Sequence, residues 1–292
     1  MIIRGTTQLT ALLGHPAAHS ISPLMHNEAF SILGLDYVYL AFDVPPVRLK
    51  AAVEGLKAIG IKGFNLTMPH KTAIIEYLDE LTAASRLCGA VNTVVNHNGR
   101  LIGHTTDGTG YMRSVSDAGY QIIGKTMTIL GAGGAATAIC TQAALDGMKE
   151  IHIFKRNNAT FQKTADFAEN LTRHTKCSVQ VFDLADTLQL KKSLAESVLL
   201  TNATNVGMEP DTNESLITDP GFFHPDLIVS DIIYHPRETR LMKLAKEAGC
   251  PAMNGLYMLL FQGAASFEYW TGREMPIEPI RQKYFNNREM TK

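Results

Sequence analysis

Three segments of the sequence carry side chains that together could transfer a hydride and a proton. In residues 65–71 (Asn-Leu-Thr-Met-Pro-His-Lys), Lys71 follows the polar end of a short apolar run that a proline terminates. Asp107 lies in a Gly-containing turn, and the segment 131–136 (Gly-Ala-Gly-Gly-Ala-Ala) follows an apolar strand. Lysine is charged at neutral pH and can donate a proton to a carbonyl under reduction. We therefore hypothesise an oxidoreductase in which Lys71 and Asp107 are the catalytic pair and share the proton, with the base unassigned between them.

The glycine-rich segment matches the pattern GxGxx[GA]. Gly131 permits the tight turn, Gly133 lets the backbone approach a pyrophosphate, and Ala136 keeps the next helix close to the strand. The amino terminus of that helix offers unpaired N–H groups and a positive dipole end. Small residues also help helices pack, but here a strand precedes the segment and a helix and second strand follow. We expect a bound NAD or NADP.

The residues after the second strand leave the choice of cofactor open. An NAD site usually has an acid there for the ribose hydroxyls, but this chain reads Lys155-Arg156-Asn157-Asn158, with no acid before Asp166. Lys155 and Arg156 could bind a 2′-phosphate, and Asn158 could bind the diol of NAD. A solvated basic turn is an equally good interpretation of these residues alone.

Other polar residues have structural alternatives. Ser22 before Pro23 has the form of a helix start, with Ser22 as the N-cap. Asn92 interrupts an apolar strand, and Gln262 interrupts an apolar helix, so each needs a polar partner if it is buried. Any one of these residues is readily explained by structure, whereas their joint occurrence favours a binding site.

The elements that must position these residues follow from apolar periodicity. In the first third we predict a mostly parallel sheet, with strands at 11–13, 37–42, 63–67 and 90–95, helices at 24–33, 47–59 and 72–78, and a hairpin through 96–99. From 127 onward we predict six strands with helical connections, as in a doubly wound nucleotide domain. Its strands are placed at 127–130, 151–154, 178–182, 198–203, 227–233 and 252–253. The last apolar helix, 257–270, should return to the first domain.

Composition narrows the function classes. The 292 residues suggest about two domains. With a net charge of −1 and dispersed basic residues, the sequence has no basic cluster of the kind that binds nucleic acid or an anionic membrane. The amino terminus lacks the features of a signal peptide, and no apolar run reaches the roughly 18 residues of a membrane span. The four cysteines and ten histidines form no metal motif. We expect a cytoplasmic enzyme without a metal.

The ordered motifs resemble those of the shikimate dehydrogenase family, especially its quinate/shikimate dehydrogenase branch. They are Gly14-His15-Pro16, the segments 19–23, 65–71, 89–93 and 106–108, the glycine loop, and the segments 255–260, 262–264 and 270–272. The resemblance covers the whole chain. It implies an α/β protein with a substrate domain (1–112 plus 257–292), a Rossmann-type dinucleotide domain (113–256) and a cleft between them.

The resemblance also implies roles for individual residues. Lys71 and Asp107 match the catalytic pair, Ser20 and Ser22 match groups that bind the substrate carboxylate, and further substrate positions are Thr67, Asn92, Gln262, Tyr39 and Tyr234. Cofactor positions are Gly131, Ala132, Gly133, Gly134, Ala135, Lys155, Arg156, Asn157, Asn158, Thr204, Asn205, Ile232, Ile233, His235 and Gly255. The chain departs from the family after the second strand, where it has Lys155-Arg156-Asn157 and NADP-specific members typically have Asn-Arg-Thr. It also departs at Asn158 and Asn205, where the quinate branch usually has an acid and a lysine, respectively.

The implied activity is reversible NAD- or NADP-dependent oxidation of shikimate to 3-dehydroshikimate, within aromatic amino acid biosynthesis, by a monomer or homodimer. Two alternatives stay open. Quinate could be the main substrate in a catabolic role, or the chain could be a non-catalytic dinucleotide-sensing module, which would need the glycine loop but not Lys71, Asp107 and the polar set together.

Overall fold

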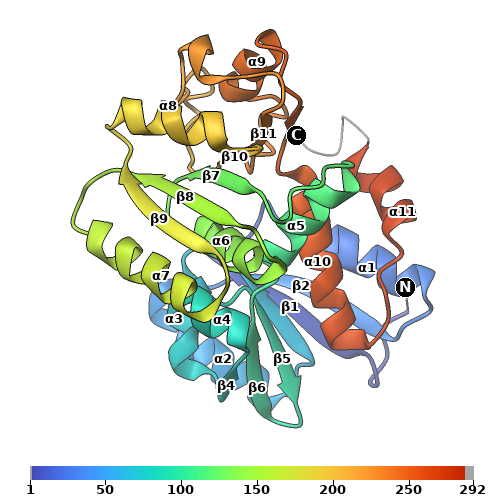
Figure 1. Ribbon diagram of the computed structural model, residues 1–292. Helices are drawn as coiled ribbons and strands as arrows, with labels where there is room; N and C mark the ends of the chain where they lie inside the picture. The colour runs from blue at the N-terminus through green and yellow to red at the C-terminus, as the bar shows by residue number, and fades with distance from the viewer. Residues whose placement is uncertain (1, 287–292) are drawn as a thin grey trace. The chain divides into compact units, whose positions relative to one another are not determined.

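The computed structural model describes residues 2–286, and the chain divides into two compact α/β units (Figure 1). The first unit comprises the chain up to residue 110 and from residue 260 onward, and the second comprises Tyr111–Leu259. The chain passes from one unit to the other within helix α5 (Asp107–Asp117) and again within helix α10 (Leu256–Thr271). These limits lie close to the domain boundaries proposed at 112 and 257.

The first unit is built on a mixed six-stranded sheet with the strand order β2-β1-β3-β5-β6-β4. Its strands are β1 (Gln8–Gly14), β2 (Tyr37–Asp43), β3 (Gly63–Leu66), β4 (Glu80–Leu81), β5 (Thr93–His97) and β6 (Arg100–His104). The pairs β1–β2, β1–β3 and β4–β6 are parallel, whereas β5 is antiparallel to both β3 and β6. The predicted hairpin therefore exists, and Asn98 and Gly99 adopt the positive φ angles that its tight turn requires.

The helices of this unit include the three predicted from the sequence, and two of those three differ from the prediction. They are α1 (Ser22–Ile32), α2 (Leu49–Ala58) after a 3₁₀ turn (Pro46–Arg48), α3 (His70–Ala73) followed by a 3₁₀ turn (Ile74–Tyr77), α4 (Ala83–Cys88), α11 (Ile277–Ile280) and a π-helical turn (Arg281–Phe285). The prediction of Ser22 as N-cap is wrong, because the helix starts one residue earlier, with Ile21 as N-cap and no side-chain cap bond. The helix expected at 72–78 is two short turns, and residues 90–92 precede strand β5.

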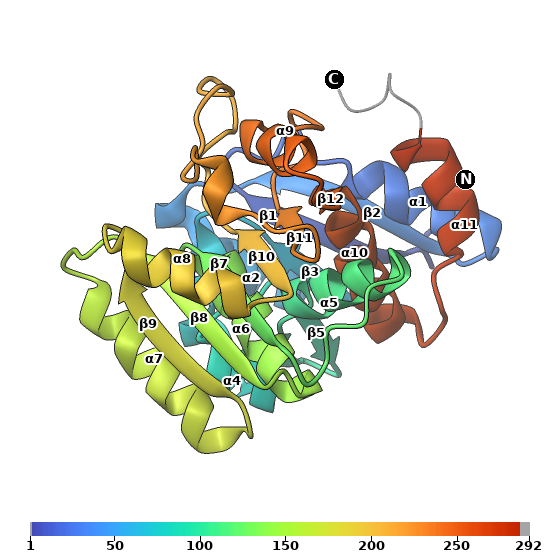
Figure 2. The same cartoon turned by 45° about the horizontal axis from the view of Figure 1, so that its top comes forward.

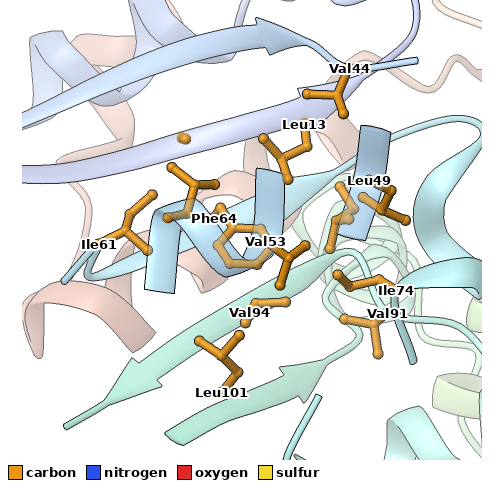
Figure 3. Packing of buried hydrophobic residues seen from close by; sticks show 13 residues of the cluster. Leu13, Val44, Leu49, Val53, Ile61, Phe64, Ile74, Val91, Val94 and Leu101 are labelled. Carbon is orange, nitrogen blue, oxygen red and sulfur yellow. The ribbon is translucent and has the colours of Figure 1, made fainter. Parts of the chain in front are cut away.

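The hydrophobic core of the first unit forms where α2 packs on the sheet (Figure 3). Leu49, Val53 and Leu56 recur at the spacing of one helix face and are buried with Phe64 of β3 and Val94 of β5. This packing fixes β3 against β5. The carboxyl end of β3, which leads into the predicted catalytic segment, is therefore held rigidly by the core.

The second unit has a parallel six-stranded sheet with the order β12-β11-β10-β7-β8-β9 (Figure 2). The chain runs β7 (Thr126–Leu130), α6 (Gly134–Asp146), β8 (Glu150–Lys155), α7 (Phe161–His174), β9 (Ser178–Asp183), α8 (Thr187–Glu196), β10 (Leu199–Asn202), a 3₁₀ turn (Pro220–Phe222), β11 (Ile228–Asp231), α9 (Arg240–Glu247) and β12 (Ala252–Met253). Every residue of β10 and β11 is buried, as expected for parallel strands covered on both faces. The order reverses at β7, which confirms the predicted doubly wound arrangement.

The last long helix, α10, contributes to the first unit as predicted. The indole N–H of Trp270 donates to the Val94 carbonyl oxygen at 3.0 Å, and the Tyr37 hydroxyl donates to the Trp270 carbonyl oxygen at 3.3 Å. Within residues 2–286, no helix has the length and apolar character needed to cross a bilayer.

Candidate functional site

The structure brings Lys71 and Asp107 together although they are far apart in the sequence. Lys71 lies on α3, just after β3, and Asp107 is the first residue of α5, just after β6. The lysine Nζ lies 2.5 Å from Asp107 Oδ2, and the side chains are 24% and 9% exposed. A carboxylate at a helix amino terminus is favoured by the positive end of the helix dipole. The lysine is therefore accessible to a small molecule, whereas its partner is almost enclosed.

Asn92 holds the second oxygen of Asp107. Its Nδ2 lies 3.0 Å from Asp107 Oδ1 and 3.3 Å from Gln262 Oε1, and its Oδ1 accepts from the Thr106 amide at 2.6 Å. Because both carboxylate oxygens accept a hydrogen bond from a different side chain, the position of Asp107 is fixed. Gln262 can lie close to the start of α5 because Gly110 has no side chain. A Cβ at Gly110 would lie 2.5 Å from the backbone nitrogen of Gln262. Asn92, Asp107, Lys71 and Gln262 thus form one polar cluster.

A buried hydrogen-bond network that the sequence interpretation missed lies beside this cluster. The Asn65 side chain accepts from the Tyr39 hydroxyl at 2.9 Å, and its Nδ2 lies 3.0 Å from both Thr93 Oγ1 and Ser266 Oγ. The Thr106 hydroxyl lies 3.0 Å from that of Thr93 and 3.2 Å from that of Ser266. A signal for Ser266 was available, because it stands one helical turn after Gln262. The network connects Tyr39 to Thr106, whose amide holds Asn92.

Of the two predicted carboxylate-binding serines, Ser22 forms a hydrogen bond with Tyr39. Ser22 is buried, and its amide donates to Ser20 Oγ at 3.2 Å. Tyr39 is fully buried, and burial raises the pKa of its hydroxyl, while a hydrogen bond with Ser22 opposes that shift. Thr67 follows β3, and its methyl group fills the space beside Gly14, where a Cβ would lie 2.3 Å away. Ser22, Tyr39 and the Asn65 network are therefore continuous with the Lys71 cluster.

The glycine loop of the second unit has the geometry that the motif predicts. Gly131 has a φ of 101°, and a Cβ there would lie 2.9 Å from the Ala203 carbonyl oxygen. Gly133 is the N-cap of α6, and the space beside the absent side chains of Gly133 and Gly134 is open. Ala136 is buried at the start of α6. The loop can therefore receive a phosphate group close to its backbone, at the amino end of a long helix.

The end of β8 departs from the expectation of a solvated basic turn. Lys155 is only 8% exposed, and burial lowers its pKa. Its Nζ donates to Asn158 Oδ1 at 3.2 Å and to Thr160 Oγ1 at 2.7 Å. Asn158 Oδ1 also accepts from the amide and hydroxyl of Thr160, at 3.1 and 2.8 Å. The oxygen of Asn158 is thus occupied, while Arg156 and Asn157 are exposed at the same turn.

The remaining predicted cofactor positions follow β10, β11 and β12. The amide of Thr204 donates to Asn202 Oδ1 at 3.1 Å, and the Gly255 amide donates to the Ile233 carbonyl oxygen at 3.1 Å. A Cβ at Gly255 would lie 1.9 Å from the Ile232 carbonyl oxygen, so this approach requires glycine. The exposed positions on these segments are Asn205, Tyr234 and His235, the last of which pairs with Glu209 at 3.2 Å. A substrate contact by Tyr234 remains a prediction.

The arrangement offers a proton-transferring pair in one unit and a dinucleotide-type loop in the other. Among residues 2–286, no three His, Cys, Asp or Glu side chains gather in a way that could hold a metal ion. The chemistry that these side chains themselves provide is proton donation, proton acceptance and hydrogen bonding to a polar ligand.

Comparison with known proteins agrees with this arrangement. The models described as "Shikimate dehydrogenase substrate binding domain" and "Shikimate 5'-dehydrogenase C-terminal domain" match residues 12–94 and 255–283. A protein of Listeria innocua named shikimate dehydrogenase (NADP(+)) is 54% identical over 283 residues, which cover 97% of each chain.

Two solved structures align over nearly the whole chain. A shikimate 5-dehydrogenase from Listeria monocytogenes, solved with shikimate and NAD, has a TM-score of 0.93 and 54% identity, covering 96% of this chain and 97% of its own. A quinate dehydrogenase from Corynebacterium glutamicum, solved with NAD, has a TM-score of 0.84 and 27% identity, covering 94% and 98%. On this evidence, the chain belongs to the shikimate dehydrogenase family.

Proposed function

We propose that the protein is an NADP-dependent shikimate dehydrogenase that interconverts shikimate and 3-dehydroshikimate. The observation that carries the proposal is the ion pair between Lys71 and Asp107, held in place by Asn92. A dinucleotide-binding module would need the glycine loop alone, whereas this chain also has a partly accessible lysine beside an oriented carboxylate. The named activities of relatives that match over almost the full chain support the same assignment.

The side chains of the first unit would manage one proton and orient the substrate. When shikimate is oxidised, its C3 hydrogen leaves as hydride and its hydroxyl proton passes to the Lys71–Asp107 pair; reduction reverses both transfers. Bound NADP would supply the hydride acceptor or donor. Asn92 and Gln262 lie beside the pair and can hydrogen-bond ring hydroxyls. Ser20 and Ser22 would orient the carboxylate through neutral hydrogen bonds, so positioning contributes more than charge pairing to binding.

The preference for NADP follows from the hydrogen-bond donors at the end of β8. Because Asn158 Oδ1 already accepts from Lys155 and Thr160, the side chain has only its N–H groups left to offer. A ribose diol needs an acceptor for its hydroxyl protons, whereas a 2′-phosphate accepts every hydrogen bond it makes. The exposed guanidinium of Arg156 adds a charge-assisted donor at the same turn. A site made of donors favours the phosphate.

Steady-state turnover tests the activity. Purified protein is assayed with shikimate or quinate against NAD+ or NADP+, by the absorbance of the reduced nicotinamide. Lys71→Met should lower kcat for shikimate by about 10²- to 10⁴-fold, the usual contribution of a positioned proton donor, with cofactor affinity unchanged. Lys50→Met, on a 68% exposed side chain, is the matched control. Wild-type turnover by Lys71→Met, or cofactor binding without turnover of either substrate, would reject the proposal.

The cofactor preference has its own test. Asn158→Asp places a carboxylate where the 2′-phosphate would bind and provides an acceptor for a diol. We expect the ratio of kcat/KM for NADP+ to that for NAD+ to fall by at least about tenfold, the equivalent of 1.4 kcal/mol. An unchanged ratio would mean that these residues do not contact the ribose.

Quinate is a second candidate substrate, because the aligned quinate dehydrogenase has the same fold over most of its length. The turnover assay described above distinguishes the two substrates, because a higher kcat/KM for quinate than for shikimate would make quinate the main substrate.

A further inference from the structure

A buried carboxylate, Asp231, lies at the carboxyl end of β11 in the second unit. It has no exposed surface and accepts three hydrogen bonds from three different segments. Its Oδ1 accepts from the Ile233 amide at 3.0 Å and from Asn202 Nδ2 at 3.1 Å, and its Oδ2 accepts from the Thr239 hydroxyl at 2.8 Å. Asp231 therefore connects the end of β10, the segment after β11 and the start of α9.

Two of these three donors, Asn202 and Thr239, hold a further piece of backbone. Asn202 stands opposite Asp231 in the β10–β11 register, and its Oδ1 accepts from the amide and hydroxyl of Thr204, at 3.1 and 2.7 Å. Asn202 Nδ2 also lies 3.3 Å from the Val206 carbonyl oxygen. The Thr239 side chain caps α9 by accepting from the Met242 amide. One carboxylate thus sets the conformation of residues 203–206 and of residues 232–239.

A carboxylate suits this position because the three groups around it each donate a hydrogen bond to it, and two of them, the Ile233 amide and Asn202 Nδ2, can only donate. An asparagine could accept the same two bonds on its oxygen, but it would reverse the bond with the Thr239 hydroxyl and remove the negative charge from all three. Burial raises the pKa of Asp231 to about 6, while the bonds from Ile233, Asn202 and Thr239 oppose the shift. The raised pKa means that burial disfavours the charged carboxylate by more than these three bonds favour it.

We propose that Asp231 is a positioning residue for the dinucleotide: its carboxylate holds the loops after β10 and β11 in the conformation that binds the cofactor. This inference rests on the proposed function, because Thr204, Asn205, Ile232, Ile233 and His235, the predicted cofactor positions on these segments, all lie on the two loops that Asp231 connects. Asp231 itself is buried and would not touch the cofactor.

The proposal predicts how cofactor binding depends on pH. When Asp231 takes up a proton, its three hydrogen bonds lose their charge and the bond with the Thr239 hydroxyl has to reverse, so the loops loosen and affinity falls as the pH drops through about 6. A second titratable group that interacts with Asp231 is Tyr111 of α5, whose pKa burial raises to about 12, so it keeps its proton throughout this range. NAD+ is the suitable probe, because the 2′-phosphate of NADP+ would itself titrate near pH 6.

Calorimetric titration of the full-length protein with NAD+, from about pH 5 to pH 8, tests the proposal. Near pH 7.5, Asp231→Asn should bind NAD+ about tenfold to hundredfold more weakly than the wild type, the loss expected for one charge-assisted hydrogen bond. Its affinity should no longer fall at acidic pH, and its KM for shikimate should be unchanged. Asp226→Asn, an exposed residue just before β11, is the control and should behave as the wild type.

The outcomes separate this inference from the proposed function. If Asp231→Asn and the wild type bind NAD+ with equal affinity and the same pH profile, the proposed role of Asp231 is wrong, whereas the proposed function is unaffected. If the variant does not fold, the wild-type profile decides, since an affinity that is flat through pH 6 overturns the inference. A wild type that binds neither NAD+ nor NADP+ at any pH would overturn the proposed function and this inference with it.

Discussion

His26 provides a sharp test of how the first unit is stabilised. Its ring is fully buried in an aromatic cluster, where it stacks on Tyr39 with ring centres 4.4 Å apart and lies 5.3 Å from the ring of Trp270. Neither ring nitrogen has a hydrogen-bond partner among the described residues. Burial lowers the pKa of His26 from 6.5 to about 3. The folded protein therefore keeps this imidazole neutral in acid.

The size and sign of the effect on stability follow from that shift. Below pH 6.5 the unfolded chain binds a proton at His26 that the folded chain does not bind, so this residue destabilises the fold as the pH falls from 6.5 toward 3. Each pH unit in this window corresponds to about 1.4 kcal/mol. At pH 4.5, two units below 6.5, the loss is about 3 kcal/mol, which is a large share of a typical net stability.

His26→Phe removes the titrating group but keeps an aromatic ring in the cluster. Chemical denaturation is followed by the fluorescence of Trp270, the single tryptophan, which lies beside the substitution. Between pH 7 and pH 4.5 the variant should lose about 3 kcal/mol less of its unfolding free energy than the wild type. His97→Phe, an exposed position at the end of β5, should show the wild-type dependence. If His26→Phe and the wild type lose the same free energy, His26 is not held neutral by burial and the reasoning fails.

Three further predictions follow from packing and polar contacts. Gly110→Ala should lower the free energy of unfolding by about 1–3 kcal/mol, because its Cβ would meet the backbone of Gln262. Gly55→Ala, in open space on α2, should raise it by up to about 1 kcal/mol, and a destabilised Gly55→Ala would contradict this reasoning. Ser266→Ala should lower kcat for shikimate about fivefold to tenfold, with KM for the cofactor unchanged, because it removes a hydroxyl that hydrogen-bonds to Asn65 and Thr106. An unaltered kcat would show that the network is only structural. Iodoacetamide near pH 8 should label the cysteines of the native protein slowly, because all four are buried and burial raises the pKa of Cys177 to about 12. In denaturant it should label all four quickly, as measured by mass spectrometry. Rapid labelling of the native protein would contradict the burial.

The elements that depend on local sequence were predicted well. Strands β7, β8 and β10, the glycine turn at Gly131 and the hairpin at Asn98 were anticipated because apolar periodicity and positive φ angles are properties of short segments. The predicted ends of the helices were less accurate. Ser22 has the residue type of an N-cap, but the tertiary fold starts the helix one residue earlier, and the cap preference was too weak to prevent it.

The sequence by itself determined which residues were candidates for the site: Lys71, Asp107 and the glycine loop could be named from residue type and spacing. Only the tertiary structure decided which side chains touch them. Asn65, Thr93, Thr106 and Ser266 come from four segments, and their contacts depend on how α10 lies on the sheet. Hydrogen bonds act over about 3 Å, whereas local patterns carry no information about distant segments at that precision. For the same reason, the burial of Lys155 and the three donors around Asp231 could not be predicted from the sequence. These contacts form only where the ends of neighbouring strands lie side by side.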